Sequence, residues 1–373
     1  MIPFNKPFLT GKETDYITDA VVSGKISGNG KYTQLCQQFF ENKFGIKKTL
    51  LTTSCTDALE MAAILIDIKE GDEVIMPSYT FVSTANAFVL RGAKIIFADS
   101  MPNHPNIDAS KIESLITPKT KAIVPVHYAG VACDMDTIMN LAKKYNLFVI
   151  EDAAQAIDSY YTGKDGIKKA LGSIGHLAAF SFHETKNIIA GEGGMLAIND
   201  EQFINRAEII WEKGTNRSAF FRGEVDKYGW VDIGSSFLPS EIIAAFLWAQ
   251  LENLEAIQKV RKQHWNAYYN QLLNWTKTNE IELPQVPNYA TNNGHMFFFK
   301  FKSMEQRTAL INKLKAKDTH PVFHYISLHS SPYYIDKHDG RSLPNTDTFT
   351  DTLVRLPLFY ELDVQKVINY ILE

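Results

Sequence analysis

Lys186, Asp152 and the run 54–57 (SCTD) are the residues whose types and positions could do chemistry together. Each follows or ends a short apolar run typical of a β-strand, and His127 holds a similar position. Lys186 also precedes the glycine-rich run 190–194 (AGEGG), where a backbone can approach closely. Ligands of open parallel sheets bind beyond the carboxyl ends of the strands, so we expect these groups to meet in one pocket.

Each of these features also has a simpler interpretation. Residues 54–57 could merely cap the helix expected from residue 58, Asp152 could cap a helix as well, and Lys186 could be a solvated surface lysine. In combination they predict a site for pyridoxal phosphate (PLP). Such an enzyme needs a lysine for the Schiff base, an acid for the pyridine nitrogen and a helix N-terminus for the phosphate.

Two other motifs predict no site. Gly28, Asn29 and Gly30 begin like a dinucleotide-binding fingerprint, but no strand precedes them and the third glycine is missing. The three histidines between residues 320 and 329 are close in sequence, yet no acid or cysteine completes a ligand set. We therefore expect neither a Rossmann site at 28–30 nor a metal site.

Seven short β-rich runs between residues 49 and 199 alternate with segments of helical character. This alternation predicts an α/β fold with a large, mainly parallel sheet of seven strands, covered by helices on both faces. The runs are TLLTT (49–53), EVIMP (73–77), KIIFAD (94–99), AIVPV (122–126), LFVIED (147–152), AAFSF (178–182) and MLAIN (195–199).

The pattern changes after residue 239. Residues 240–273 read as one long helix or two consecutive helices, followed by a strand (295–301), a helix (304–315) and a second strand (320–325). We expect a large PLP-binding domain over 1–250 and a smaller α+β domain over 251–373, packed together rather than joined by a flexible linker.

Composition restricts the class of protein. Of the 373 residues, 45% are hydrophobic and 21% are charged, which indicates a folded globular chain. The formal net charge of −4 offers no attraction to nucleic acids or anionic membranes. Three widely spaced cysteines, and the lack of a signal-like or membrane-spanning apolar run, favour a reduced cytoplasmic protein.

Long stretches of the chain resemble the nucleotide-sugar aminotransferases of the DegT/DnrJ/StrS family. These are PLP enzymes of fold type I, the fold of aspartate aminotransferase. The stretches run nearly end to end: 2–8 (IPFNKPF), 23–40 (SGKISGNGKYTQLCQQFF), 52–63 (TTSCTDALEMAA), 71–93, 125–130 (PVHYAG), 150–156 (IEDAAQA), 180–187 (FSFHETKN), 191–194 (GEGG), 323–329 (FHYISLH) and 356–362 (LPLFYEL).

The resemblance implies roles for individual residues. Lys186 would be the catalytic residue that bonds to PLP and then carries a proton between substrate and cofactor. Asp152 would pair with the pyridine nitrogen. The other implied cofactor contacts are Gln155 near the ring hydroxyl, Phe81 stacked on the ring, and Thr56, Asp57 and Ser181 at the phosphate; His183 and His324 would line the sugar side.

Relatives place the active site at the interface of a homodimer. Many of them carry a G-x-N-x-R pattern whose asparagine reaches the neighbouring subunit's cofactor phosphate, where this chain has residues 234–238 (GSSFL). Ser236 can still donate a hydrogen bond there, whereas Leu238 cannot replace an arginine. We expect a homodimer with a shared site and Ser236 as a cofactor contact.

Two further runs, 212–218 (EKGTNRS) and 232–236 (DIGSS), are similar to enzymes that form dTDP-4-amino-4,6-dideoxy-D-galactose. This implies dTDP-4-keto-6-deoxy-D-glucose and L-glutamate as substrates, and lipopolysaccharide or enterobacterial common antigen as the destination. Lys213 and Arg217 would bind the nucleotide diphosphate, although a solvated loop is equally open. The alternatives are another keto nucleotide sugar, the dehydratase branch, which replaces the lysine, and a non-catalytic PLP-binding regulator.

Overall fold

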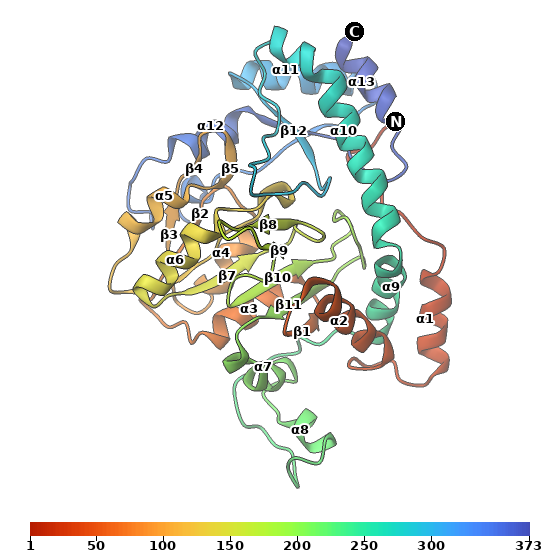
Figure 1. Cartoon of the computed structure of the whole chain (residues 1–373), viewed down its shortest axis with the longest axis vertical. Coiled ribbons are helices and arrows are strands. Elements are labelled where there is room, and N and C mark those ends of the chain that lie inside the picture. Colours follow the sequence, from red (N-terminus) through yellow and green to blue (C-terminus); the bar gives the residue numbers. More distant parts are fainter.

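A computed structural model describes all 373 residues, and its centre is a seven-stranded sheet (Figure 1). The strand order is β1-β11-β10-β7-β6-β2-β3, and only β11 runs against its neighbours. The strands are β1 (Lys48–Thr52), β2 (Glu73–Pro77), β3 (Lys94–Ala98), β6 (Thr120–Ile123), β7 (Phe148–Asp152), β10 (Leu177–Ser181) and β11 (Gly194–Ile198). The expected α/β fold with a mainly parallel sheet is confirmed.

The direction of the strands brings the candidate site residues to one edge of the sheet. β1, β7 and β10 run the same way, so the residues that follow them lie at the same edge. β11 begins at this edge, where Gly194 pairs with Thr52 on one side and with Ser181 on the other. Gly194 therefore lies between the C-terminal ends of β1 and β10, at the edge of the sheet that carries the candidate site residues.

Helices cover both faces because the strands are apolar on both faces, as in buried parallel sheets. Residues that alternate along β1 and β2 belong to two different hydrophobic clusters. One cluster lies under α2 (Lys31–Phe44), α6 (Met135–Tyr145) and α9 (Glu241–Glu252), and the other under α3 (Cys55–Leu65), α4 (Val82–Val89) and α7 (Ile204–Trp211).

The run 28–30 forms the N-terminus of α2, where Glu241 of α9 acts as the cap. The Glu241 carboxylate is 1% exposed and accepts hydrogen bonds from the backbone N–H of Gly30 (3.0 Å), Tyr32 (2.7 Å) and Thr33 (3.1 Å). A side chain at Gly28 would overlap the backbone at Pro239. The two glycines thus allow α9 to approach α2, and this helix N-terminus already has its anion.

The C-terminal part forms a smaller α+β unit around its own apolar core. Helix α10 (Leu254–Thr278) follows α9 almost directly, and a three-stranded antiparallel sheet has the order β12-β14-β13. Its elements are β12 (Phe297–Lys300), β13 (Val322–Phe323), β14 (Leu353–Leu356), α11 (Met304–Lys315) and α13 (Val364–Leu372). The expected strand–helix–strand order of this region is present.

Contacts cross the expected domain border at residue 250 in both directions. Ile2 packs against the C-terminal core, and its backbone N–H bonds the carbonyl of Asp318 (2.6 Å). Tyr334 packs in the core of the large sheet, where its hydroxyl accepts a hydrogen bond from Ile95 N (2.6 Å). The division at residue 250 stays a prediction.

The segment around α8 (Arg217–Phe221) projects away from the body of the molecule (Figure 1). It carries exposed aromatic side chains, including Phe221 (69% exposed) and Trp230 (85%). None of the helices is long and apolar enough to cross a membrane. The remaining elements are α1 (Glu13–Val22), α5 (Ala109–Ile112), α12 (Pro344–Thr352), β4 (Ser100–Met101), β5 (His104–Ile107), β8 (Tyr160–Thr162) and β9 (Lys168–Ala170).

Candidate active site

A cavity of about 870 Å³ opens at the carboxyl edge of the large sheet. Its lining includes residues at the ends of β7 and β10, and residues of and beside β13 and β14 of the C-terminal part. Eight of the residues expected at the site line this single cavity: Thr56, Phe81, Asp152, Gln155, Ser181, His183, Lys186 and His324. The strand ends therefore bring together residues separated by up to 268 positions in sequence.

Asp152 ends β7 and is 5% exposed. Its Oδ2 accepts a hydrogen bond from the hydroxyl of Thr84 (2.6 Å), and its Oδ1 accepts one from the backbone N–H of Ala154 (3.1 Å). Neither partner carries a charge, and an ionised carboxylate is costly to bury without a cation. The cavity thus presents a fixed, buried carboxylate to which a cationic ring nitrogen is complementary.

Lys186 lies in a loop held at its base by β10 and β11. The ladder between these strands continues beyond Ser181 and Gly194 through the backbone bonds Phe182 N to Gly193 O (2.8 Å) and Ala190 N to Phe182 O (2.7 Å). Burial lowers the pKa of the Lys186 amine, an effect opposed by Cys55 and Asp152 and reinforced by Arg355. A lower pKa leaves more of the amine neutral, and the neutral amine is the nucleophile.

The N-terminus of α3 forms an anion cradle beside Lys186. Ser54 is the N-cap, and its hydroxyl accepts the backbone N–H of Asp57 (3.1 Å). The first N–H groups of a helix have no partner inside it, so those of Cys55 and Thr56 remain for a ligand. The Thr56 hydroxyl bonds that of Ser83 (2.9 Å), and a side chain at Gly194 would overlap the backbone of Ser54 and Cys55.

Asp57 differs from the expectation for a phosphate contact, because it does not line the cavity. Its backbone N–H donates to Ser54, and its carboxylate accepts a hydrogen bond from the Thr53 hydroxyl. Both of its polar groups are therefore used within the chain. Its negative charge sits in the first turn of α3, where it interacts favourably with the helix dipole.

Aromatic and polar side chains close the cavity around the place of a bound ring. Phe81, the N-cap of α4, is 57% exposed, and its ring centre lies 6.3 Å from that of Tyr325. Gln155 accepts the N–H of Ala129 (2.7 Å) and donates to the Tyr325 hydroxyl (3.3 Å). These contacts hold Gln155 in one orientation at the wall of the cavity.

The two expected histidines take different partners. His183 bonds the Thr185 hydroxyl through Nδ1 (2.9 Å) and lies 3.6 Å from Glu192 through Nε2. His324 bonds the Tyr128 hydroxyl through Nδ1 (3.0 Å), and burial lowers its pKa well below the usual range. His324 is therefore a neutral group near pH 7.

The cavity also contains residues that the sequence analysis did not single out, among them Thr84, His295, Tyr325 and Arg355. Tyr325 and Arg355 lie within or directly before the matching runs 323–329 and 356–362, which was the available signal for them. His295 bonds Asn187 (2.7 Å), one residue after Lys186. Thr84 lies within the matching run 71–93, but inside a helix rather than at a strand end, so the strand-end rule did not single it out.

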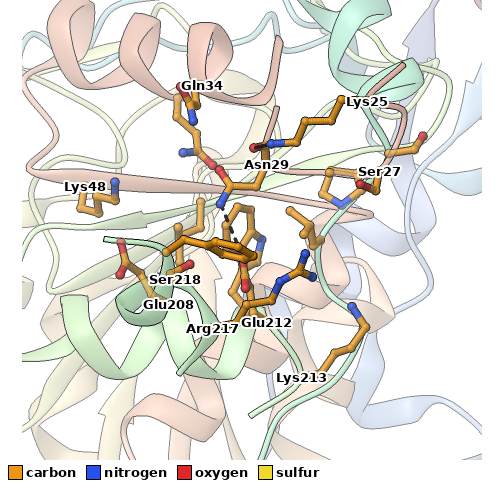
Figure 2. Close-up of a pocket in the computed structure, with 18 of the residues that line it drawn as sticks. Lys25, Ser27, Asn29, Gln34, Lys48, Glu208, Glu212, Lys213, Arg217 and Ser218 are labelled. Atoms are coloured by element: carbon orange, nitrogen blue, oxygen red, sulfur yellow. Dashed lines mark hydrogen bonds between the residues drawn. The ribbon is translucent and has the colours of Figure 1, made fainter. Parts of the chain in front are cut away.

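Lys213, Arg217 and Ser236 do not reach this cavity within one chain. Lys213 and Arg217 line a second cavity of about 910 Å³, between α2, α7 and α8. Figure 2 shows Arg217 there beside Glu212, which accepts a hydrogen bond from Asn29 (3.3 Å). Ser236 forms an isolated β-bridge with Glu212. None of these three residues lines the Lys186 cavity of its own chain.

The residues of the first cavity fit PLP. An amine of lowered pKa, a buried carboxylate whose hydrogen-bond partners are neutral and an open helix N-terminus match the aldehyde, the ring nitrogen and the phosphate of that cofactor. Lys186 would hold its aldehyde carbon, Asp152 its ring nitrogen, and the start of α3 with Ser181 its phosphate. Fold and site together define a PLP-dependent enzyme of fold type I.

Comparison with known proteins gives the family. The model of the DegT/DnrJ/EryC1/StrS aminotransferase family matches residues 7–372, so the chain belongs to this family. It is a PLP-dependent sugar aminotransferase.

Relatives match over nearly the whole chain. The spore coat polysaccharide biosynthesis protein SpsC of Bacillus subtilis is 32% identical, covering 99% of this chain and 95% of that protein. GDP-perosamine synthase of Caulobacter vibrioides is 33% identical, and the match covers 88% of this chain and 85% of that protein. Among solved structures, the aminotransferase from Psychrobacter cryohalolentis is 26% identical with a TM-score of 0.90. The match covers 98% of this chain and 96% of that chain.

Proposed function

We propose that this aminotransferase transfers the amino group of L-glutamate to C4 of dTDP-4-keto-6-deoxy-D-glucose, giving dTDP-4-amino-4,6-dideoxy-D-galactose. The observation that carries the proposal is the run 212–218, with 232–236, which resembles the enzymes that make this product. The product would enter a surface polysaccharide such as lipopolysaccharide or enterobacterial common antigen. SpsC, a relative, is also a polysaccharide biosynthesis protein. The buried free thiols of Cys36 and Cys133 agree with the reduced cytoplasm as its place of work.

Each of the eight expected residues that line the first cavity has a task in this reaction. PLP, when bound, withdraws electrons from the substrate carbon that carries nitrogen. Lys186 would bond the cofactor, and its free amine would carry the proton between substrate and cofactor carbons. Asp152 would favour a protonated ring nitrogen through its negative charge. The remaining roles are those of Phe81 against the ring, Gln155 near its hydroxyl, Thr56 and Ser181 at the phosphate, and His183 and His324 toward the sugar.

A homodimer with a shared active site is part of the proposal. The segment around α8 projects from the chain with apolar side chains exposed, as expected of a surface covered by a second copy. Lys213, Arg217 and Ser236 lie in or beside this segment and do not line the Lys186 cavity of their own chain. In the dimer, Ser236 would contact the partner's cofactor phosphate.

The second cavity has the charge needed for a nucleotide diphosphate. Five basic side chains line it, against three acidic ones: Lys25, Lys48, Lys213, Arg217 and Arg222 against Glu41, Glu208 and Glu212. Guanidinium groups form paired, charge-assisted hydrogen bonds with phosphate. We therefore assign the diphosphate of the sugar nucleotide to Lys213 and Arg217.

A GDP-linked 4-keto sugar is the second candidate substrate, because one relative is GDP-perosamine synthase. The two candidates share the reaction at C4 and differ in the base that the nucleotide pocket must accept. A non-catalytic PLP-binding regulator is less consistent with the site, because Lys186, Asp152 and the open end of α3 are all in place. The dehydratase branch is disfavoured because Lys186 is present.

The test is an assay of the purified holoenzyme against dTDP- and GDP-linked 4-keto sugars and a 3-keto sugar, with L-glutamate as donor. Turnover of the dTDP-linked 4-keto sugar should exceed the others by at least about tenfold. The proton NMR spectrum of the product should show small couplings at H4, since an axial amine leaves that hydrogen equatorial. A large H3–H4 coupling, or an amine at C3, would refute the proposed product.

A further inference from the structure

Arg355 of β14 projects into the Lys186 cavity with most of its hydrogen-bonding capacity unused. The side chain is half-buried, and its guanidinium lies 4.5 Å above the ring of Phe4. Its Nε is buried without a hydrogen-bond partner. Its Nη2 has one long contact, 3.5 Å, to the carbonyl oxygen of Phe323. A group with five N–H donors therefore has a single weak acceptor.

No acidic side chain forms an ion pair or a hydrogen bond with Arg355, although Asp152 and Glu192 also line the cavity. The groups that interact electrostatically with Arg355 are the hydroxyls of Tyr128, Tyr325 and Tyr79, the amine of Lys186, and two histidines. Burial lowers the pKa of Arg355, yet an arginine keeps its charge in proteins. The buried Nε has no partner within the chain, and the guanidinium lines an open cavity, so an anion from outside the chain could complete its hydrogen bonds.

We propose that Arg355 binds a carboxylate of the amino-acid donor. This rests on the proposed function, because it takes the donor of the transamination to be L-glutamate. The guanidinium fork matches a carboxylate with two parallel hydrogen bonds. Arg355 and Lys186 line the same cavity and influence each other's charge, so a donor held by Arg355 presents its amino group on the Lys186 side.

The charge distribution favours the donor over the sugar nucleotide as the ligand. Arg355 is the only arginine of the Lys186 cavity, whereas a diphosphate offers two phosphate groups and suits the basic residues of the second cavity. The two half-reactions of a transaminase separate these ligands, because the donor reacts in the first and the sugar in the second. Replacing a donor-binding residue should therefore change the half-reaction with the donor and leave the half-reaction with the sugar unchanged.

The experiment measures both half-reactions in the holoenzyme by stopped-flow spectroscopy for Arg355→Lys and Arg355→Met. With L-glutamate, the concentration for half-maximal rate should rise about 10- to 100-fold in Arg355→Met, and less in Arg355→Lys, which keeps the charge without the fork. The limiting rate should fall much less. The half-reaction of the sugar with the aminated holoenzyme should stay within about threefold of wild type.

A binding measurement complements the kinetics. Glutarate, a dicarboxylate without an amino group, is titrated into each holoenzyme by calorimetry, and its dissociation constant should rise by the same factor as the glutamate value. Arg307→Met is the matched control: Arg307 also lies in the C-terminal part with an unpartnered Nε, but it bonds the carbonyl of Thr350 (3.0 Å) and does not line the cavity. Arg307→Met should leave unchanged both the glutamate concentration for half-maximal rate and the dissociation constant of glutarate.

The outcomes distinguish this inference from the proposed function. An effect confined to the sugar half-reaction, or unchanged glutamate and glutarate constants in both Arg355 variants, would overturn the assignment of Arg355. A wild-type enzyme that accepts glutamate but none of the keto sugars would refute the proposed substrate and leave the donor site intact. If Arg355→Met does not fold, Arg355→Lys decides.

Discussion

The hydroxyl of Thr84 lies 2.6 Å from Oδ2 of Asp152, and the hydroxyl of Thr80 lies 2.9 Å from that of Thr84. All three side chains are buried. A hydroxyl has one proton and a carboxylate only accepts, so Thr84 donates to Asp152 and Thr80 donates to Thr84. With the N–H of Ala154 on the other oxygen, Asp152 is held in one orientation before any cofactor binds.

Replacing Thr84 by Val keeps the shape of the side chain and removes the donor to Asp152. A hydrogen bond to a charged group contributes about 1.5–3 kcal/mol, so we expect the rate of the glutamate half-reaction to fall roughly tenfold. In Asp152→Asn the rate of the glutamate half-reaction should fall further, because a neutral amide no longer favours a protonated ring nitrogen. Stopped-flow spectra measure both, with the exposed Thr18→Val of α1 as control. Equal rates in wild type and Asp152→Asn would mean that another group protonates the ring.

Lys186→Ala should abolish the covalent attachment of PLP and lower turnover by at least about 10³-fold, because nucleophile and proton carrier are lost together. Borohydride reduction followed by mass spectrometry of the peptides detects the attachment. Lys164→Ala, in an exposed loop, is the control and should retain the label at residue 186. Full turnover in Lys186→Ala would disprove the role of this lysine.

Gly194→Ala tests the close approach of β11 to the start of α3. The added methyl would overlap the backbone of Ser54 and Cys55, so these residues must move away from their position in the phosphate cradle. We expect PLP affinity to fall about 10-fold or more, measured by titration of the apoenzyme. At the neighbouring Gly193 a methyl meets only ordinary contacts at 3.4 Å, so Gly193→Ala should bind PLP normally. Similar affinities for the two variants would argue against this cradle.

His104 should make the protein sensitive to acid. Burial lowers its pKa from 6.5 to about 3, so below pH 6.5 the unfolded chain takes up a proton that the folded protein refuses. The stability that this residue contributes is complete above pH 6.5 and is lost as the pH falls toward 3, at about 1.4 kcal/mol per pH unit. His104→Phe should flatten the dependence of the free energy of unfolding on pH between 6 and 4 by that slope. Urea titrations at a constant protein concentration measure it, and an unchanged slope would show that His104 is protonated in the native state.

The strands were predictable because buried parallel strands are continuous apolar runs, and all seven were located from the sequence. The strand ends then identified Lys186 and Asp152. The same rule misjudged His127, whose Nε2 bonds the fully buried Glu151 (2.9 Å) away from the cavity. A strand end predicts which edge a residue reaches, whereas its hydrogen-bond partner decides whether it faces a ligand.

Other features depend on contacts that no local pattern records. Arg355 lines the same cavity as Lys186 because the small C-terminal sheet packs beside the large one, and the position of one sheet relative to another is not encoded in either strand alone. Asp57 was expected at the phosphate, but Thr53 and Ser54 occupy its polar groups. Ser236 and Lys213 lie apart from Lys186 because one chain supplies only part of the surface that we propose for the dimer.

The cap that Glu241 provides for α2 has a consequence for the order in which the chain acquires structure. The N-terminus of α2 must wait for an anion that lies about 210 residues later in the sequence, and β1 must likewise wait for β11. During synthesis the first fifty residues therefore leave the ribosome well before their partners exist. We expect this N-terminal part to remain open to proteases on nascent chains that stop before residue 241, and to become protected only on longer ones. The central strands, whose neighbours lie closer in sequence, can pair earlier.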